Sequence, residues 1–319
     1  MEQSNTQNKQ SNSNSGHWFW GIMISLIVVA LIFAGLSFIF LANIFSGSGR
    51  YDEQTGKGNG KIAVVDLDFT ILSSESIVRQ FKKYGEDKSI KAIILYVNTP
   101  GGGVAASQEM YEAIKRTRDK GKPVIVSISS LGASGGYYAA CGGSLIVANP
   151  GSLVGSIGVI INLMNFKELA EKIGVNETII KSGELKDAGN PFREINEKDR
   201  EYFQDIVDDS YDQFLDVVSV ARKMDKEKLK EIANGRVFTG RQAKEIGLID
   251  SLGTFEDAIR ITSRIAGIEG EPTIVKEKEK GSLIERILDS FSNNDLKSIK
   301  NELKGEFLEQ PILQYKFIY

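Results

Sequence analysis

Short β-rich runs alternate with helical segments through the middle of the chain, and this alternation limits the fold more than any other feature. Four runs rich in Ile, Val, Leu and Ala have the length of buried strands, and they lie at residues 62–66, 92–96, 123–127 and 145–148. The pattern between these runs predicts helices near residues 74–86, 104–119 and 134–142. Buried strands that alternate with helices form a largely parallel sheet with helices on its faces. The sequence therefore predicts an α/β domain over residues 61–270.

A longer amphipathic helix is predicted over residues 197–222 of the same domain. One face carries apolar side chains at helical spacing, namely Phe203, Ile206, Val207, Phe214 and Val218. Acidic side chains occupy much of the remaining surface, at Asp205, Asp208, Asp209, Asp212 and Asp216. A metal site is one interpretation of these carboxylates, but we favour a solvated helix face, so no metal site is predicted.

The N-terminal part of the chain has a different character. Residues 1–17 are mostly Asn, Gln and Ser, which is too polar for a core, and they are predicted to form a disordered head. Residues 18–45 contain no charged residue, and these 28 residues exceed the roughly 20 that cross a bilayer as a helix. Because the apolar region of a cleavable signal has only about 7–15 residues, we interpret this run as a retained transmembrane helix. The few charges on its two sides do not decide its orientation.

Two further segments flank the predicted domain. Residues 46–60 are rich in Gly and Ser and are interpreted as a flexible linker. A phosphate-binding loop would need Ser or Thr after Gly56-Lys57, and Gly58 stands there instead. Residues 271–319 are predicted to be a C-terminal extension, which begins with a charged stretch and ends in an apolar, aromatic tail.

The composition excludes several kinds of chemistry. The chain has one Cys and one His, which excludes an intramolecular disulfide and a Cys-rich zinc site. The single histidine, His17, lies in the polar head, so a Ser-His-Asp triad and a Cys-His pair lack their base. A formal net charge of −3 gives no sign of a nucleic-acid surface. Any catalytic base must therefore be another type of residue.

Four segments have glycines where the backbone would approach another group closely: residues 98–103, 130–137, 151–158 and 181–192. The first joins a strand to a helix, where free N–H groups and the helix dipole suit a phosphate or an oxyanion, although a plain turn is an alternative. In the second, Ser134 lies between Ala133 and Gly135 and is either a nucleophile or a helix cap. The third offers the hydroxyl groups of Ser152 and Ser156, and the fourth offers two lysines.

A lysine acts as a general base only when it is neutral. The ordinary lysine pKa of about 10.4 would have to fall by roughly 3 units, which corresponds to about 4 kcal/mol of bias against the ammonium. Burial in a water-poor site supplies such a bias, and a nearby hydroxyl can hold the amine in place. Most lysines are surface charges, so spacing alone does not identify the base.

The glycine-containing segments and two later motifs together resemble one family. The matching motifs are Gly132-Ala-Ser-Gly-Gly-Tyr137, Gly155-Ser-Ile-Gly-Val159, Lys181-Ser-Gly with Lys186-Asp and Pro191-Phe-Arg193, Gly235-Arg-Val-Phe-Thr-Gly240, and Gly247-Leu-Ile-Asp250. They resemble the signal peptide peptidase A family, membrane-anchored bacterial Ser-Lys peptidases within the Clp-protease/crotonase superfamily. The resemblance covers residues 61–265 and the N-terminal anchor, and it is to the short Gram-positive form. It implies a fold of repeated ββα units.

The resemblance also implies a role for each matching residue. Ser134 matches the nucleophile, and Lys186, 52 residues later, matches the general base, whereas Lys181 is not the matching lysine. Ser156 matches the hydroxyl that orients the lysine. Gly101 matches the main oxyanion-hole donor, with Gly102 beside it. The family usually has Ser where this chain has Thr99, and little consequence is expected because backbone N–H groups perform this role.

The implied activity is hydrolysis of cleaved signal peptides and other short hydrophobic peptides, without a cofactor. Family members form dome-shaped rings, so a homo-oligomer, an octamer, is expected, with the catalytic domain outside the cytoplasm. The tail from Ile312 to Tyr319 resembles the expected substrates; occupation of an active site and packing on an oligomer interface both remain open. Tyr137 and Tyr138 are expected in the core rather than in a substrate groove, and Cys141 is expected to be a small core residue. The rival interpretations are a crotonase-like acyl-CoA enzyme and an inactive membrane scaffold.

Overall fold

A computed structural model describes residues 50–279 and 314–316, together with residues 20, 22–29, 31, 32, 35 and 37. It divides into two compact units, Met1–Tyr51 with Lys278–Ile299, and Asp52–Glu277 with Lys300–Tyr319. In the first unit, the described residues between 20 and 37 are helical. Within the described part of the chain, no helix combines the length and the apolar character needed to span a membrane. Most of the transmembrane helix predicted over residues 18–45, and the head over residues 1–17, lie outside the described residues.

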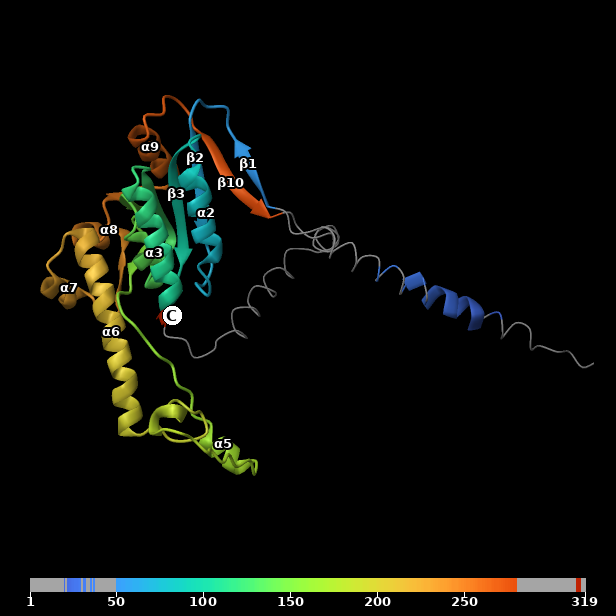
Figure 1. The fold of residues 1–319 in the computed structure, drawn as a ribbon. Helices are drawn as coiled ribbons and strands as arrows, with labels where there is room; N and C mark the ends of the chain where they lie inside the picture. The colour runs from blue at the N-terminus through green and yellow to red at the C-terminus, as the bar shows by residue number, and fades with distance from the viewer. Residues whose placement is uncertain are drawn as a thin grey trace, which may run out of the picture. The chain divides into compact units, whose positions relative to one another are not determined.

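A central sheet organises the described residues, as Figure 1 shows. Its strands are β1 (Arg50–Thr55), β2 (Lys61–Leu67), β3 (Ile90–Thr99), β5 (Val124–Ala133), β6 (Leu145–Ala148), β7 (Leu153–Gly155), β8 (Val237–Thr239), β9 (Ser251–Leu252) and β10 (Thr273–Glu279). The order is β1-β10-β2-β3-β5-β6-β9, with β7 beside β5 and β8 beside β7. Every pair from β10 to β9 is parallel, and β7 pairs antiparallel with β8. The predicted α/β class and largely parallel sheet are therefore confirmed.

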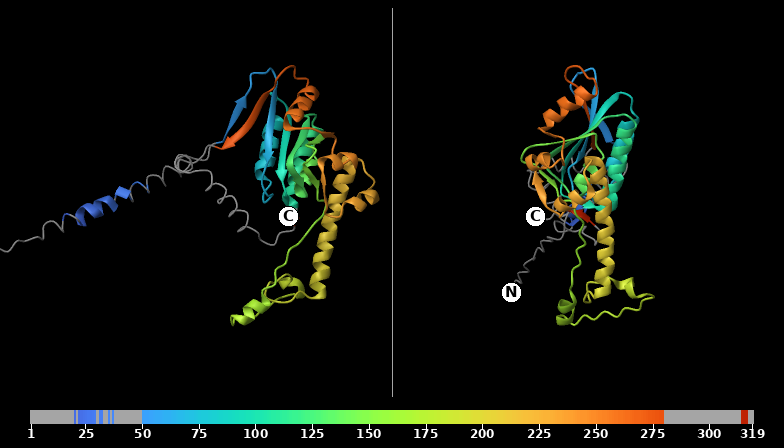
Figure 2. Two further views of the ribbon diagram at one scale, coloured as in Figure 1. Left: turned by 180° about the vertical axis from the view of Figure 1, so that it is seen from behind. Right: turned by 90° about the vertical axis from the view of Figure 1, so that its left-hand side faces the viewer.

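Helices cover both faces of the sheet because successive side chains of a strand point to opposite sides. In β2, Ala63 and Val65 face the larger core, which is covered by α2 (Glu75–Glu86), α3 (Val104–Asp119) and α4 (Gly135–Ala140). Ile62 and Val64 face the other side, under α9 (Phe255–Ile265). The second view in Figure 2 shows α9 and the α2–α3 pair on opposite sides of the sheet.

The predicted long helix is α6 (Glu197–Arg222), with the predicted bounds. A capping box between Asn196 and Asp199 begins it, and Lys223, with a φ of 53°, ends it. The predicted solvated face is confirmed, because the five aspartates are exposed, and Lys226 pairs with Asp212 and Asp216. Two short helices follow, α7 (Lys226–Ile232) and α8 (Gly240–Glu245).

Residues 160–196, here called the arm, extend away from the sheet alongside the first half of α6 (Figures 1 and 2). The arm contains α5 (Lys167–Lys172) and a 3₁₀ turn, η1 (Glu184–Asp187). Ala170 is its only buried residue. Many large apolar side chains of the arm are exposed: Met164, Phe166, Leu169, Ile173, Val175, Ile179, Ile180, Leu185, Phe192 and Ile195. An apolar surface of this extent is typical of an interaction site.

The sheet extends beyond residues 61–270 on both sides. β1 lies within the segment interpreted as a linker, and β10 lies within the segment interpreted as a C-terminal extension. The charged residues of β10 are compatible with a strand because they have partners: Lys276 pairs with Asp66, and Glu277 binds Arg79 and Lys83. A further short strand, β11 (Gln314–Lys316), pairs with β4 (Gly101–Gly103).

Candidate active site

Ser134 lies on the sharp turn between β5 and α4. Its backbone has φ 53° and ψ −118°, a strained conformation for a residue with a side chain. The residue is only 1% exposed, and among the described residues its Oγ has no hydrogen-bond partner. The hydroxyl makes no capping hydrogen bond to α4, which disfavours the helix-cap interpretation. A sharp, strained strand-to-helix turn is a recurrent setting of a nucleophilic serine. The Ser134 hydroxyl has no hydrogen bond to a base among the described residues, although activation requires one.

Ser156 lies next to Ser134 because of the register of two parallel strands. Ala133 of β5 is the partner of Gly155 of β7, so the residues that follow them are adjacent. Ser134 N–H donates to the carbonyl of Gly155 at 2.7 Å. Ser156 also has a positive φ, 50°, and is 5% exposed. The structure therefore places the predicted nucleophile and the predicted lysine-orienting residue at neighbouring backbone positions.

The three glycines of β4 form a backbone ledge beside this turn. Ile71 holds the ledge on one side: its N–H donates to the Gly101 carbonyl at 2.8 Å, and its carbonyl accepts from Gly103 N–H at 2.7 Å. A Cβ at Gly135, the residue after Ser134, would lie 3.3 Å from the Gly102 nitrogen. The Gly102 amide is therefore close to the predicted nucleophile, where an oxyanion donor would have to be.

The Thr99 side chain makes hydrogen bonds at this site that the sequence does not predict. Its hydroxyl accepts from Gly101 N–H at 3.1 Å and donates to the carbonyl of Phe69 at 2.5 Å. The predicted main oxyanion donor is thus bonded to Thr99. Backbone groups alternate in direction along a strand, and Ile71 binds Gly101 and Gly103, so Gly102 presents its N–H and carbonyl to the opposite edge.

A strand from the C-terminal end of the chain occupies that opposite edge. β11 pairs antiparallel with β4, in a register that places Tyr315 opposite Gly102, Gln314 opposite Gly103 and Lys316 opposite Gly101. The ledge therefore accepts an extended peptide through main-chain pairing.

Lys186 lies elsewhere, in η1 of the arm. It is exposed, and in the described part of the chain its ammonium has no hydrogen-bond or ion-pair partner. No described contact joins it to Ser134. Lys181, the lysine that does not match the family base, instead donates to the Glu184 carbonyl at 3.0 Å and to Asp187 Oδ1 at 2.7 Å. The structure thus brings Ser134, Ser156 and the glycine ledge together but does not bring Lys186 to them.

The aromatic and thiol groups after Ser134 belong to the core, as predicted. Tyr137 is fully buried and donates to the Leu248 carbonyl at 2.6 Å. Tyr138 packs edge-on against Tyr111. Burial raises the pKa of the Cys141 thiol to about 12, so this thiol is a poor nucleophile.

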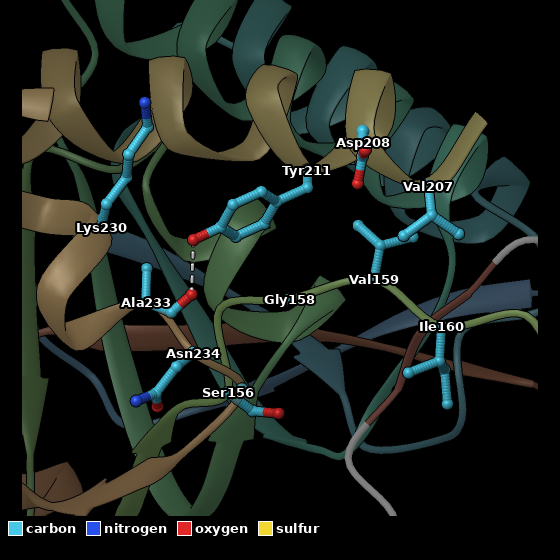
Figure 3. Close-up of a pocket in the computed structure, with 11 residues that line it drawn as sticks. Ser156, Gly158, Val159, Ile160, Val207, Asp208, Tyr211, Lys230, Ala233 and Asn234 are labelled. Atoms are coloured by element: carbon cyan, nitrogen blue, oxygen red, sulfur yellow. Dashed lines mark hydrogen bonds between the residues drawn. The ribbon is translucent and has the colours of Figure 1, made fainter. Parts of the chain in front are cut away.

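A cavity of about 500 Å³ adjoins Ser156 (Figure 3). The walls come from the segment after β7, from α6 and from α7, with Val159, Ile160 and Val207 as apolar members. Tyr211 extends across it and donates to the Ala233 carbonyl at 2.6 Å. Asp208 and Lys230 also line the cavity. It therefore offers apolar contacts and charges of both signs beside a predicted site residue.

Comparison with known proteins gives two family matches, "Peptidase family S49" over residues 116–269 and "Clp protease" over residues 63–152. The first match includes Ser134, Ser156 and Lys186, and the second includes the glycine ledge.

Three relatives illustrate the similarity. A protein of Synechocystis sp. named as a protease is 41% identical over 66% of this chain and 76% of its own length. A protein of Enterococcus faecium named as a signal peptide peptidase, SppA, is 34% identical over 75% of this chain and 76% of its own length. The chloroplastic serine protease SPPA of Arabidopsis thaliana is 34% identical over 73% of this chain and 35% of its own length.

Proposed function

The chain belongs to peptidase family S49 and is a serine endopeptidase, and on that premise we propose that Ser134 and Lys186 form a catalytic dyad that cleaves short hydrophobic peptides. One observation supports the nucleophile above all. The buried, unpaired hydroxyl of Ser134 stands on a strained turn beside Ser156 and the glycine ledge. Cleaved signal peptides are the proposed substrates, in agreement with the name of the Enterococcus faecium relative.

In the proposed mechanism, neutral Lys186 accepts the proton of Ser134 Oγ while that oxygen attacks the peptide carbonyl. The tetrahedral oxyanion accepts hydrogen bonds from the ledge, with Gly101 and Gly102 as the donors. Lys186 then protonates the leaving amine, and a water molecule deprotonated by the same lysine hydrolyses the acyl-enzyme. The hydroxyl of Ser156 orients the Lys186 amine toward Ser134 Oγ. In the structure the Gly101 N–H bonds to the Thr99 hydroxyl and faces the opposite edge of β4 from the Gly102 N–H, so Gly101 donates to the same oxyanion only if its N–H turns away from Thr99.

We propose that Lys186 serves Ser134 of a neighbouring subunit. A neutral amine requires a water-poor site, and the exposed position of Lys186 on its own chain does not provide one. The apolar surface of the arm supports burial against another copy, and the cavity beside Ser156 is a suitable place for the incoming segment. The proposed assembly is a homo-octamer, as the family resemblance implies.

The substrate is proposed to bind as an added strand on β4. Main-chain pairing accepts many sequences, which suits the clearance of varied peptides. The pairing of β11 with β4 supports this mode and also supports the C-terminal tail as a ligand of an active site. A tail in this position competes with substrate, and the enzyme trims it if a tail bond reaches Ser134.

Membrane anchoring is proposed from the sequence. The uncharged run over residues 18–45 is long enough to span a bilayer, and the catalytic domain is proposed to lie outside the cytoplasm. A fold of repeated ββα units is proposed for the domain, supported by the Clp protease match.

A fluorophosphonate probe, which labels activated serines, tests the dyad on the full-length protein in detergent. We expect labelling at Ser134 only, and we expect Lys186→Ala to slow both labelling and peptide hydrolysis by about 1,000-fold or more. Lys172→Ala is the matched control, because Lys172 is another exposed lysine of the arm, and it should react like the wild type. Hydrolysis that survives Lys186→Ala would exclude this lysine as the base, and thioester turnover that survives Ser134→Ala would favour an acyl-CoA enzyme.

The same samples test trimming of the tail. The intact mass of the wild type should be lower than that of Ser134→Ala by the mass of a C-terminal peptide, after correction for the substitution. An identical C-terminus in both proteins would contradict trimming.

A further inference from the structure

The turn that carries Lys186 is held by a cluster of charged side chains to which the sequence assigns no separate role. Arg193 lies at the centre of this cluster, between Asp187 and Asp199, and Lys181 also binds Asp187, at Oδ1. Asp187 is the last residue of η1 and follows Lys186 directly. We call Arg193, Asp187 and Asp199 the clamp.

Arg193 contacts each aspartate with two nitrogens. Its Nε and Nη2 donate to Asp187 Oδ2 and Oδ1 at 3.0 and 3.2 Å, and Nη2 also donates to the Asp187 carbonyl at 3.0 Å. On the other side, Nη2 donates to Asp199 Oδ1 at 3.0 Å, and Nη1 binds Asp199 Oδ2. The planar guanidinium therefore joins two carboxylates at a fixed separation, which a lysine ammonium does not reproduce.

The far end of the clamp belongs to a rigid element. Asp199 is 1% exposed and closes the capping box of α6, where its N–H bonds to Asn196 Oδ1 at 2.9 Å. Asp187 is also well covered, with 10% of its side chain exposed. The clamp thus connects η1 to the first turn of a long helix.

Apolar packing contributes little to the shape of the arm. Ala170 is the only buried residue between positions 160 and 196, so apolar packing within one chain does not position η1. Lys181 reinforces the same turn through the carbonyl of Glu184, and Lys198 of α6 binds the Glu184 carboxylate, although both of these side chains are more exposed than the clamp. The direction in which Lys186 leaves the arm therefore depends mainly on these ionic hydrogen bonds.

We propose that Arg193 is a positioning residue for the catalytic base. By joining Asp187 to Asp199, it fixes η1 on the start of α6 and presents the Lys186 amine in one orientation. This inference rests on the proposed role of Lys186. It assigns a specific task to a side chain that does not touch the substrate or the reacting atoms.

The test compares Arg193→Gln and Arg193→Lys with a matched substitution elsewhere, Arg79→Lys. Arg79 makes a similar bidentate contact, with Glu277 at 2.9 and 2.5 Å, and Lys83 binds the same carboxylate at 3.3 Å. The two arginine side chains are also similarly exposed, 26% and 32%. For each full-length protein, kcat and KM are measured on a hydrophobic peptide from pH 5 to 10, with melting temperature and oligomer mass.

We expect Arg193→Gln to lower kcat by about 100-fold while KM changes by less than about threefold. The reason is that displacing a catalytic group by about 1 Å lowers the rate by about this factor. The midpoint of the rising limb of the pH–rate profile should also move. Arg193→Lys, which keeps one of the two contacts, should recover part of kcat, and Arg79→Lys should keep the wild-type profile.

Two results would overturn the inference. The first is a kcat of Arg193→Gln equal to that of the wild type. The second is a loss of activity that is fully explained by a smaller fraction of folded protein, with an unchanged pH–rate profile. Lys186→Ala, assayed in parallel, separates a failure of this inference from a failure of the proposed function. If Lys186→Ala remains active, the lysine is not the base, and Arg193 has no base to position.

Discussion

At position 102 the fold accepts only a residue without a side chain. Gly102 has a φ of 153°, and a Cβ there would lie 2.1 Å from the carbonyl oxygen of Ile71. Backbone atoms cannot approach so closely, so the ledge would have to move. Because the ledge is bonded to Ile71 on both sides of Gly102, such a movement would shift the amide beside Gly135 as well.

We therefore predict that Gly102→Ala lowers kcat by about 100-fold or more, because the proposed oxyanion donor leaves its position. Peptide turnover and the melting temperature are measured together. Gly151→Ala is the control, since a Cβ at Gly151 meets no atom within 4 Å. Wild-type turnover in Gly102→Ala would show that the ledge does not bind the oxyanion.

Single residues differ in how well the sequence predicts them. Ser134 and Ser156 are marked by small neighbours and glycines at fixed positions, and the structure places them side by side. No comparable sequence pattern predicts the hydrogen bonds of Thr99 and Arg193. Their hydrogen bonds join segments whose approach depends on loop conformation, and a single sequence carries no periodic signal for that.

Elements with a strong apolar period are predicted well. The four strands and α6 agree with the structure because burial on a regular backbone imposes periods of 2 and 3.6 residues. β10 is different: its Lys and Glu residues suggest a solvated extension, and ion pairs with Asp66 and with α2 accommodate them in a strand. The arm has weak periodicity because its regular elements, α5 and η1, are only six and four residues long.

The clamp gives the arm a predictable response to acid. Hydrogen bonds from Arg193 and then from Lys181 lower the pKa of Asp187 from 3.8 to about 2. A lowered pKa in the folded state means that the stabilisation is complete above about pH 4 and is lost as the pH falls toward 2. The clamp therefore stays intact over the range in which peptide hydrolysis is assayed.

Hydrogen exchange with mass spectrometry measures this response. We expect protection in residues 181–193, corrected for the intrinsic exchange rate, to be constant from pH 8 to pH 5 and to fall between about pH 4 and pH 2. Asp187→Asn should lower protection of the same segment at every pH. Residues 104–119 of α3 serve as the internal control. Protection that is lost already above pH 5 would contradict the assignment to Asp187.

On the scale of the whole molecule, one chain contains all the proposed catalytic groups but does not assemble them. Ser134 is buried between β5 and α4, whereas Lys186 is exposed on the arm. The family motifs predict a catalytic role for both residues, but sequence spacing does not reveal which chain supplies each one to a given site. In a closed symmetric ring every subunit gives and receives the same contact, so every site can be completed by its neighbour.

Mixed assemblies distinguish the two arrangements. Ser134→Ala and Lys186→Ala subunits with different tags are coexpressed, and assemblies that carry both tags are isolated. If the lysine comes from a neighbour, about one quarter of the sites in a random one-to-one mixture hold both wild-type groups, and activity returns to that level. If each chain completes its own site, every site lacks one group, and the mixture remains as inactive as either parent. Activity thus reports directly whether the exposed lysine of one subunit reaches the buried serine of another.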